Sequence, residues 1–416
     1  MSARGAHTGG MGNANTLRTR CCIVGGGPAG MMLGLLLARA GVDTVVLEKH
    51  GDFLRDFRGD TVHPSTLQVL DDLGLMPRFE RLPQHREREL RLQIDGRSYP
   101  FGDFSGLSPF DYIAFVPQWD LLDLLADEAR RHPNFQLLMN AEATHLLRDA
   151  DERVTGVVAE TAHGSLRVKA DLVVACDGRS STLRADAQLP AREFGAPIDV
   201  LWFRMPRGDG DPPHSMGIVD RGRMLVLIDR GDYWQCAYVI AKGGLDALKA
   251  QGLAAFRDGL AASAPFMAAR VASLESWEQI KLLTVQVNRL ERWHRPGLLL
   301  IGDAAHAMSP VGGVGINLAI QDAVCAANRL TDALRGDAAI DESLLAAVQK
   351  RRMAPTRLIQ RIQLTIQRRV IAAALNAKST PKPPAWLPPL LRFRIVRSIP
   401  ARVFGLGFRR ERPRHL

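Results

Sequence analysis

A glycine-rich segment near the N-terminus has the residue types and spacing needed to bind a phosphate-containing ligand. Residues 25–30 follow the pattern G-x-G-x-x-G, come directly after the apolar run 21–24, and open a helix predicted over 31–40. The glycines allow a tight turn, and a helix N-terminus presents unpaired N–H groups and a positive dipole to a pyrophosphate. Glu48 ends a second predicted strand, 44–47, and can accept hydrogen bonds from ribose hydroxyls. The pattern predicts a dinucleotide site formed by Gly25, Gly27, Pro28, Ala29, Gly30, Glu48 and the adjacent Lys49.

Two later motifs bear on whether the dinucleotide is a flavin or a nicotinamide, since both bind to this pattern. In the first, the apolar run 298–301 is followed by Gly302 and by Asp303, whose carboxylate can hold a ribityl or ribose hydroxyl. The chain then passes through a glycine-rich loop into a helix predicted over 317–330. This loop and helix start offer N–H donors that would stabilise the negative charge of a reduced flavin. The candidate residues are Gly302, Asp303, Pro310, Gly313, Gly315, Ile316 and Asn317.

The second of these motifs is an Asp-Gly pair at the end of a buried strand. The apolar run 172–176 leads into Asp177 and Gly178, and Ser181 and Arg184 follow shortly after. Taken alone, this pair is explained equally well as the exit turn of a parallel strand. Asp177 becomes a candidate binding residue because it occurs together with the other two motifs.

The three motifs, in this order, resemble those of the aromatic-hydroxylase family of flavoproteins, the para-hydroxybenzoate hydroxylase-like group A monooxygenases, over residues 20–185 and 285–330. The resemblance implies that segment 25–30 binds the FAD diphosphate and that Glu48 binds the adenosine ribose. It implies that Asp303 binds the ribityl chain, and that Asp177 serves both FAD and NAD(P)H. Arg58 and Gln118 resemble the FAD-contacting Arg and Gln of the family. Without the resemblance they could be a surface arginine and a helix-capping glutamine.

The chemistry implied by this resemblance is that of an FAD-dependent monooxygenase that consumes NADPH or NADH. Such an enzyme forms a flavin C4a-hydroperoxide with dioxygen and hydroxylates or epoxidises an aromatic, quinone-like or polyketide-like substrate. We assign no catalytic residue, because His63 and His306 lie near the flavin motifs but are equally well explained as structural. A flavin-dependent reductase or halogenase on the same scaffold is an alternative, and a non-catalytic flavin-binding regulator is another.

The elements that must position these motifs are buried strands separated by helices, which is typical of an α/β fold. We expect a Rossmann-like FAD-binding domain with a parallel sheet, an inserted antiparallel-sheet substrate domain and a helical C-terminus. The insertion is indicated by two predicted hairpins, one with strands 90–94 and 97–101 and the other with strands 224–228 and 234–240. Candidate substrate contacts in it are Trp202, Phe203, Met224, Trp234 and Tyr238.

The predicted division of the chain has four parts. The FAD-binding domain comprises 20–85, 113–189 and 286–350, and the substrate domain comprises 86–112 and 190–285. Residues 1–19 are interpreted as a disordered leader, and residues 351–416 as a basic helical C-terminal segment.

The net charge of +10 is concentrated at the C-terminus, since residues 350–416 contain 17 of the 54 Lys and Arg but only one of the 44 Asp and Glu. In the stretch 351–371 the basic residues are mixed with apolar ones and no aromatics are interleaved, so we expect no nucleic-acid partner. An amphipathic helix lying on a membrane is one interpretation, and a helix packed on the flavin domain is the other. No apolar run reaches the roughly 18 residues of a spanning helix.

The five cysteines show no metal-ligand spacing, so we expect no metal site. They are interpreted as small core residues of a cytoplasmic protein. The partners expected are a small organic substrate and dioxygen, and the sequence does not indicate an oligomeric state.

Overall fold

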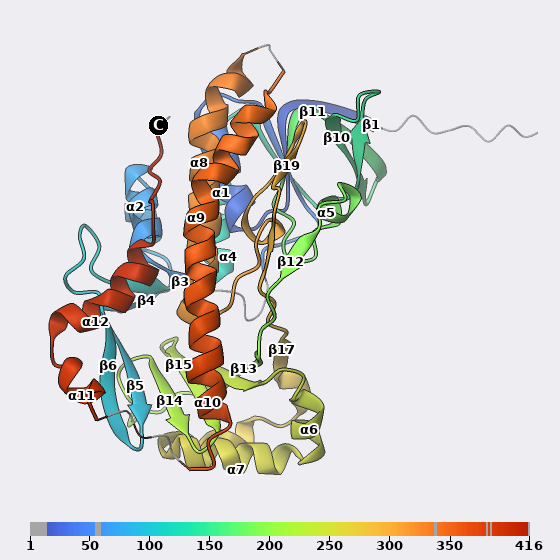
Figure 1. Ribbon diagram of the computed structural model, residues 1–416. Coiled ribbons are helices and arrows are strands. Elements are labelled where there is room, and N and C mark those ends of the chain that lie inside the picture. The colour runs from blue at the N-terminus through green and yellow to red at the C-terminus, as the bar shows by residue number, and fades with distance from the viewer. Residues whose placement is uncertain (1–14, 55–59, 337–338, 380–381, 383–384, 415–416) are drawn as a thin grey trace, which may run out of the picture.

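The computed structural model describes residues 15–54, 60–336, 339–379, 382 and 385–414. Figure 1 shows two sheet-containing bodies, one above the other, with the long helix α9 (Glu342–Ile366) running alongside both. The predicted α/β class, with a parallel sheet, an antiparallel sheet and a helical C-terminus, is confirmed.

The upper body is built on an eight-stranded sheet whose central strands are parallel. The central segments of this sheet, 21–24, 45–47, 172–175 and 298–300, are apolar and buried, as expected where both faces of a parallel sheet are covered. In sheet order they are β19 (His294–Arg295), β20 (Leu298–Leu300), β11 (Gly164–Ala175), β1 (Asn15–Val24), β2 (Thr44–Glu48) and β8 (Phe135–Met139), with β10 (Val154–Thr161) and β9 (Glu142–Arg148) continuing from β11.

Three helices form the hydrophobic core on one face of this sheet: α1 (Pro28–Arg39), α4 (Gln118–Ala129) and α8 (Gly315–Arg335). Helix α1 ends as predicted, because Gly41 takes the left-handed conformation, with φ 77°, one residue beyond the C-cap. Helix α9 packs on α8 from outside. The shorter helices of this body are α2 (Pro64–Asp72), α3 (Met76–Phe79) and α5 (Thr182–Asp186).

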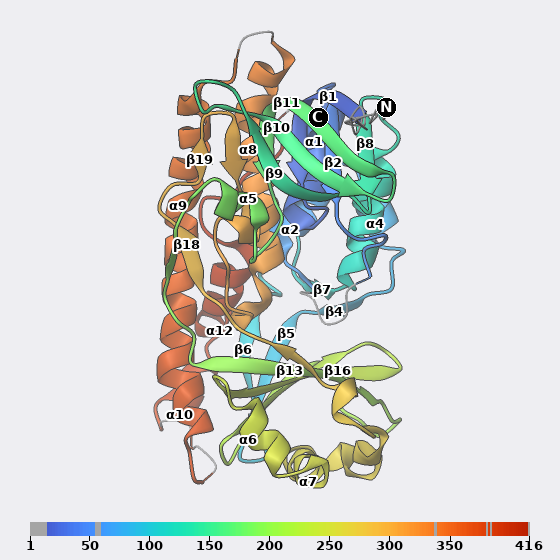
Figure 2. The ribbon, with the colours of Figure 1, turned by 90° about the vertical axis from the view of Figure 1, so that its right-hand side faces the viewer.

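The lower body is a seven-stranded, mainly antiparallel sheet, and Figure 2 shows helices α6 (Leu245–Ala250) and α7 (Leu253–Ser263) beneath it. Both predicted hairpins are present, and Asp95 and Gly96 in the first turn have φ values of 51° and 70°. In sheet order the strands are β17 (Lys281–Leu283), β13 (Ile198–Pro206), β16 (Tyr233–Ala241), β15 (Arg223–Asp229), β14 (Met216–Asp220), β5 (Glu89–Ile94) and β6 (Arg97–Asp103).

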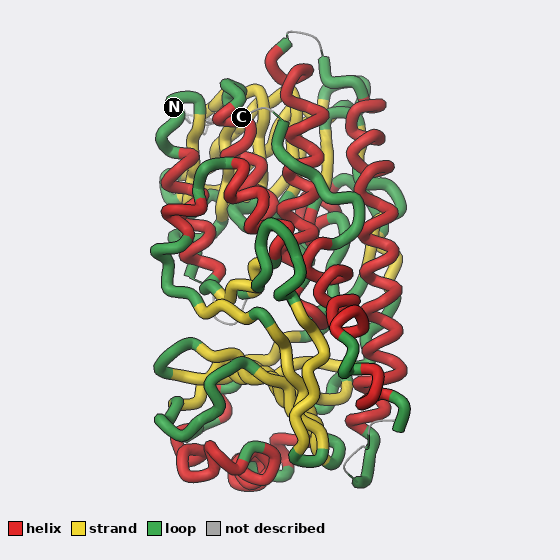
Figure 3. The backbone as a smooth tube through the Cα atoms, turned by 90° about the vertical axis from the view of Figure 1, so that its left-hand side faces the viewer, coloured by secondary structure: helices red, strands yellow, loops and turns green. Residues whose placement is uncertain are grey.

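Two small sheets connect the bodies, and Figure 3 shows strand segments between the upper and lower sheets. One consists of β3 (Thr61–Val62), β7 (Ile113–Phe115) and β4 (His85–Glu87), and the other of β12 (Ala191–Glu193) and β18 (Asn288–Leu290). Short one-turn or 3-10 segments complete the chain at η1 (Pro265–Ser273), η2 (Trp277–Gln279), η3 (Gly302–Ala304) and η4 (Val311–Gly313).

The C-terminal segment continues from α9 through η5 (Gln367–Ile371), α10 (Ala372–Leu375), α11 (Leu387–Leu390), α12 (Arg394–Pro400) and η6 (Ala401–Leu406). Within the described ranges, no helix combines the length and the apolar character needed to cross a bilayer.

Two predicted boundaries differ from the structure. Strand β1 begins at Asn15, and residues 15–19 of the expected leader pair with β11. The side chains of residues 16–19 alternate along the chain, as in a strand, and so these residues extend the sheet. The boundary at 350/351 falls inside α9, whose buried face continues across it.

Candidate functional site

The turn between β1 and α1 is shaped by glycines at two points. Gly25 has φ 105°, and a Cβ there would lie 2.4 Å from the carbonyl oxygen of Cys176, so the turn packs directly on the end of β11. A Cβ on Gly30 would lie 1.9 Å from the carbonyl oxygen of Gly25, which keeps α1 close to the turn. These two contacts require glycine for steric reasons.

The N-terminus of α1 is open to a ligand. Gly27 is the N-cap and has no side chain to cap the helix, and a Cβ there would meet nothing within 4 Å. Pro28 takes the first helical position, where its missing N–H removes no hydrogen bond, and Ala29 is buried behind it. There is therefore room for a ligand beside the N-cap, where the N-terminus of a helix offers N–H donors to an anion such as a diphosphate.

Glu48 is held against this turn by the backbone. The N–H of Gly26 donates to Oε2 over 2.8 Å, and the N–H of His50 donates to Oε1 over 3.1 Å. An ionised carboxylate has about four acceptor positions, so capacity is left for hydroxyl donors. The adjacent Lys49 is exposed.

Asp177 lies at the end of β11, beside the Gly25 turn. Its Oδ2 accepts the N–H of Leu183 over 3.2 Å, whereas Oδ1 is buried and has no partner among the described residues. Burial raises the pKa of the carboxyl group, and hydrogen bonds from Ser181 and Leu183 partly offset that. A buried acceptor without a donor costs free energy, so this oxygen is suited to a ligand hydroxyl or N–H.

Gly302 and Asp303 follow β20, which lies next to β11. Gly302 has φ 60°, and a Cβ there would approach Cβ of Ala29 to 3.2 Å, so this turn packs on the start of α1. The Asp303 side chain is 41% exposed, with Oδ2 3.9 Å from Nε of Arg179. The three motifs thus meet at one edge of the sheet, because they end the neighbouring parallel strands β2, β1, β11 and β20.

A buried ion cluster that the sequence analysis missed supports the Gly302 turn. Asp322 on α8 accepts the N–H of Gly302 over 3.2 Å and lies 2.6 Å from Nε2 of His306. Nε of Arg352 on α9 donates to its other oxygen over 2.8 Å. Burial alone would raise the pKa of Asp322, but His306 and Arg352 lower it overall. His306 therefore has a structural partner, and the only signal in the sequence is a carboxylate within the apolar face of α8.

The loop between η3 and α8 is closely supported by α2 and β3. Gly312 and Gly313 have φ values of 78° and 61°, and a Cβ on Gly313 would lie 2.7 Å from Oγ1 of Thr61. Asn317 Oδ1 accepts the N–H of His63 over 3.1 Å, and the His63 ring lies 2.9 Å from the carbonyl oxygen of Gly312. Burial lowers the pKa of His63 to about 4, so the neutral ring donates from Nε2 and holds the loop. Of the other candidates here, Pro310 caps η4, Gly315 begins α8 and Ile316 is buried.

Side-chain amides of α9 and of the first residue of η5 hold the other end of this loop, and they too were missed. Gln360 donates to the carbonyl oxygens of Asn288 and Ala307, and Gln363 donates to those of Ser309 and Val311 over 2.9 and 2.7 Å. Gln367 donates to the Ser309 hydroxyl over 2.5 Å. The helical spacing of the three glutamines was visible in the sequence, but their partners lie about 50 to 70 residues away.

Gln118 begins α4 at the junction of the two bodies, where its backbone N–H donates to the buried carboxylate of Asp60. Asp60 also accepts hydrogen bonds from Gln235, over 2.6 Å, and from Arg230, both on the hairpin of β15 and β16. This cluster joins the two sheets. Arg58, the remaining candidate, lies outside the described residues.

The five candidate substrate contacts lie on different faces of the lower sheet. Phe203, Trp234 and Tyr238 belong to the core between the sheet and α7, so the interpretation of these three as substrate contacts is wrong. Trp202 and Met224 are on the opposite face, packed near Val311 of the glycine loop. Alternation along a strand separates the two sets but does not say which set faces the other body.

Comparisons with known proteins agree with this geometry. A family model described as "FAD binding domain" matches residues 18–362. The 6-methylpretetramide 4-monooxygenase of Streptomyces rimosus is 34% identical over 375 residues, which cover 89% of this chain and 88% of that protein.

Two solved structures share the fold at lower identity. The p-nitrophenol 4-monooxygenase PnpA of Pseudomonas putida DLL-E4 superposes with a TM-score of 0.75 at 20% identity, covering 95% of this chain and 100% of that one. The anhydrotetracycline hydroxylase OxyS of Streptomyces rimosus does so with a TM-score of 0.72 at 24% identity, covering 94% of this chain and 76% of that one.

Proposed function

Because the chain belongs to the family described as FAD binding domain and is an FAD-dependent monooxygenase, we propose that it hydroxylates an electron-rich aromatic ring of a polyketide-like substrate. The observation that carries the proposal is the meeting of the Gly25 turn, Glu48, Asp177 and Gly302 at one sheet edge, next to a second sheet. The monooxygenase relatives also favour oxygenation over the reductase and halogenase alternatives.

In this proposal the FAD diphosphate binds at the N-terminus of α1 and the adenosine ribose binds Glu48. Asp303 would accept hydrogen bonds from the ribityl hydroxyls of the cofactor. The unpaired oxygen of Asp177 would accept one from FAD or NAD(P)H. The N–H groups of the loop before α8 stabilise negative charge on the reduced ring. Bound FAD, after reduction by NADPH or NADH, supplies the activation of dioxygen and the delivery of one oxygen atom to the substrate.

The substrate ring would lie between the glycine loop and the upper face of the lower sheet. Support comes from the apolar residues Trp202, Met224 and Val226 on that face and from Val311 on the loop, which belong to one packed group. Such a face binds an aromatic ring and keeps water away from the reacting atoms. Among relatives, the 6-methylpretetramide and dehydrotetracycline enzymes are named for polycyclic substrates, and this is our basis for the substrate class.

The first experiment measures the absorbance spectrum of the purified protein, followed by NADPH and NADH oxidation and oxygen uptake. Monocyclic phenols and polycyclic phenolic polyketides are compared as substrates. We expect bound FAD and oxygen uptake stimulated most by the polycyclic compounds. Flavin that is reduced without substrate-dependent oxygen uptake, or a purified protein that does not retain FAD after reconstitution, would contradict the proposal.

A pair of variants tests the position of the substrate. Trp202→Ala should raise KM for the aromatic substrate at least tenfold, because a buried aromatic contact contributes about 1.4 kcal/mol or more. Trp386→Ala is the matched control, since Trp386 is 63% exposed on the C-terminal segment. Equal KM values for the two variants would place the substrate elsewhere.

We also propose that the C-terminus makes a peripheral membrane contact through residues 386–399. Ile359 and Ile371, which a membrane-bound amphipathic helix would expose, are buried against the rest of the protein, so this part of the segment is packed rather than free. Further along, Phe393, Ile395 and Ile399 are 63%, 80% and 53% exposed and lie among arginines, which suits an anionic lipid surface.

Co-sedimentation with phosphatidylcholine vesicles, with and without phosphatidylglycerol, tests this contact. Wild type should bind only the anionic vesicles, and Ile395→Glu should abolish binding. Binding that survives this substitution would argue against the contact.

We also propose a cytoplasmic location. The proposal rests on the free cysteines, which are all buried or half-buried, and burial raises the pKa of Cys22 to about 12.

A further inference from the structure

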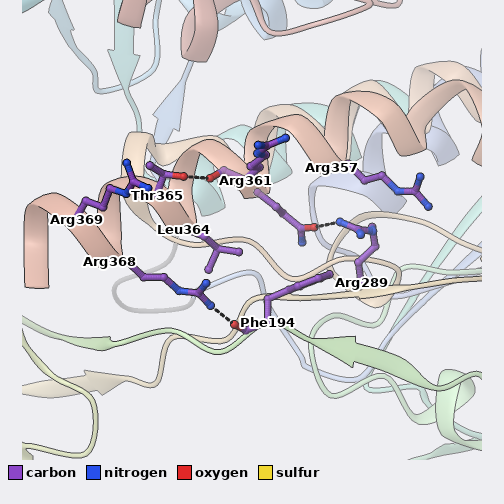
Figure 4. A pocket seen from close by; sticks show the side chains of 9 residues that line it. Phe194, Arg289, Arg357, Arg361, Leu364, Thr365, Arg368 and Arg369 are labelled. Carbon is purple, nitrogen blue, oxygen red and sulfur yellow. Dashed lines mark hydrogen bonds between the residues drawn. The ribbon is translucent and has the colours of Figure 1, made fainter.

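A basic pocket of about 470 Å³ lies on the outer side of α9, away from the residues proposed to hold FAD. Arg357, Arg361 and Arg368 of the helical segment line it together with Phe194 and Arg289 from the segments around β12 and β18, and Figure 4 shows Arg368 extending to Phe194. None of these residues belongs to the Gly25, Asp177 or Gly302 turns. The pocket is therefore a separate feature of the fold.

The positive charge in this pocket is only partly balanced by acids, since Glu291 raises the pKa of Arg289 less than burial and the neighbouring arginines lower it. Arg357, Arg361 and Arg368 follow one another at helical spacing and are exposed, and like charges one turn apart destabilise a helix. In the part of the chain that the structure describes, no acid forms an ion pair with these three or with Arg289. Burial lowers the pKa of Arg289, and the neighbouring Arg357 and Arg192 lower it further. A bound anion would remove this repulsion.

Two of the arginines are already oriented by neutral groups. Arg289 donates to Oε1 of Gln360 over 2.6 Å, and its guanidinium lies 4.8 Å from the ring centre of Phe194. Arg368 donates to the carbonyl oxygen of Phe194 over 2.6 Å. Their remaining N–H groups are held in a fixed fork, the geometry that matches phosphate oxygens. Ordering these side chains in advance reduces the entropy lost on binding.

We propose that this pocket binds a phosphate-bearing small-molecule anion, with the pyrophosphate group as its simplest form. Two sources share this chemistry: the dinucleotide co-substrate and another phosphorylated molecule. Only with the co-substrate does the inference rest on the proposed function. The pocket also touches the active-site loop, because Gln360 bonds Arg289 on one side and the carbonyl oxygen of Ala307 on the other. An occupant of the pocket therefore lies one side chain from segment 307–311.

The experiment measures binding of pyrophosphate to the FAD-loaded enzyme by calorimetry, at low and at moderate salt. The test variant is Arg361→Gln with Arg368→Gln, and the matched control is Arg97→Gln with Arg410→Gln, which removes equal charge from exposed positions outside the pocket. Wild type and control should bind pyrophosphate. The test variant should bind at least about tenfold more weakly, because hydrogen bonds between charged groups are stronger than neutral ones.

The two sources are distinguished by NADPH kinetics on the same variants. A raised KM for NADPH with unchanged kcat in the test variant alone supports the co-substrate, and an unchanged KM together with lost pyrophosphate binding supports another phosphorylated molecule. The inference is overturned if the wild-type enzyme does not bind pyrophosphate or if the test and control variants bind it equally. It is also overturned if the arginines of the pocket bind anionic lipid vesicles but not pyrophosphate. An enzyme that oxidises no NADPH would count against the proposed function, while the pyrophosphate measurement would still test the pocket.

Discussion

Arg352→Met should destabilise the enzyme far more than the same change at the preceding residue. Arg352 and Asp322 are 1% and 0% exposed, with 2.8 Å between Nε and Oδ1. Removing one partner of a buried ion pair leaves an uncompensated charge and typically costs about 3–5 kcal/mol. His306 still contacts Asp322, so we expect about 3 kcal/mol, a large part of the roughly 5–15 kcal/mol of a folded protein.

The control is Arg351→Met, because Arg351 pairs with Glu411 and the two side chains are 34% and 9% exposed, so water reaches the arginine of this pair. A pair of this kind contributes about 1 kcal/mol or less. Urea unfolding of the FAD-loaded enzymes, followed by circular dichroism and by flavin fluorescence, gives both free energies. Asp322→Asn added to Arg352→Met should recover part of the loss, because no buried charge is then unpaired. A cost below about 1 kcal/mol for Arg352→Met, or one equal to the control, would refute the reasoning.

Three further predictions concern the cofactor turn and its support. Gly30→Ala should leave the protein without FAD, since the new Cβ would lie 1.9 Å from the oxygen of Gly25, whereas Gly27→Ala should fold normally and bind FAD more weakly. The flavin-to-protein absorbance ratio and thermal unfolding check both variants, and normal FAD content in Gly30→Ala would contradict this prediction. Glu48→Gln should weaken FAD binding about tenfold, through loss of charge-assisted hydrogen bonds, in equilibrium dialysis; unchanged affinity would remove Glu48 from the site. Burial lowers the pKa of His63 from 6.5 to about 4, so the unfolded chain binds more protons between these pH values, and the free energy of unfolding should fall as pH falls from 6.5 towards 4. In urea titrations at several pH values, His63→Gln should make this dependence on pH weaker. An unchanged dependence would argue against a neutral His63 in the folded protein.

The sequence alone was sufficient where a pattern and its consequence lie close together in the chain. The turn at Gly25, the end of α1 before Gly41 and the hairpin turn at Asp95-Gly96 lie where the sequence placed them, because glycine spacing and turn residues act on their own backbone. Apolar runs placed the strands that end at the motifs, and parallel pairing brings such ends to one edge.

Only the tertiary structure decided which distant residues support the site. Arg352 belongs to the basic tail by composition, yet it is buried on Asp322, and three glutamines of α9 and η5 hold the loop at 307–311. Strand alternation separated Trp202 from Phe203 but left open which of them faces the flavin-binding body. The physical reason is that periodicity defines faces of an element, whereas the partner of each face depends on contacts between segments far apart in the chain.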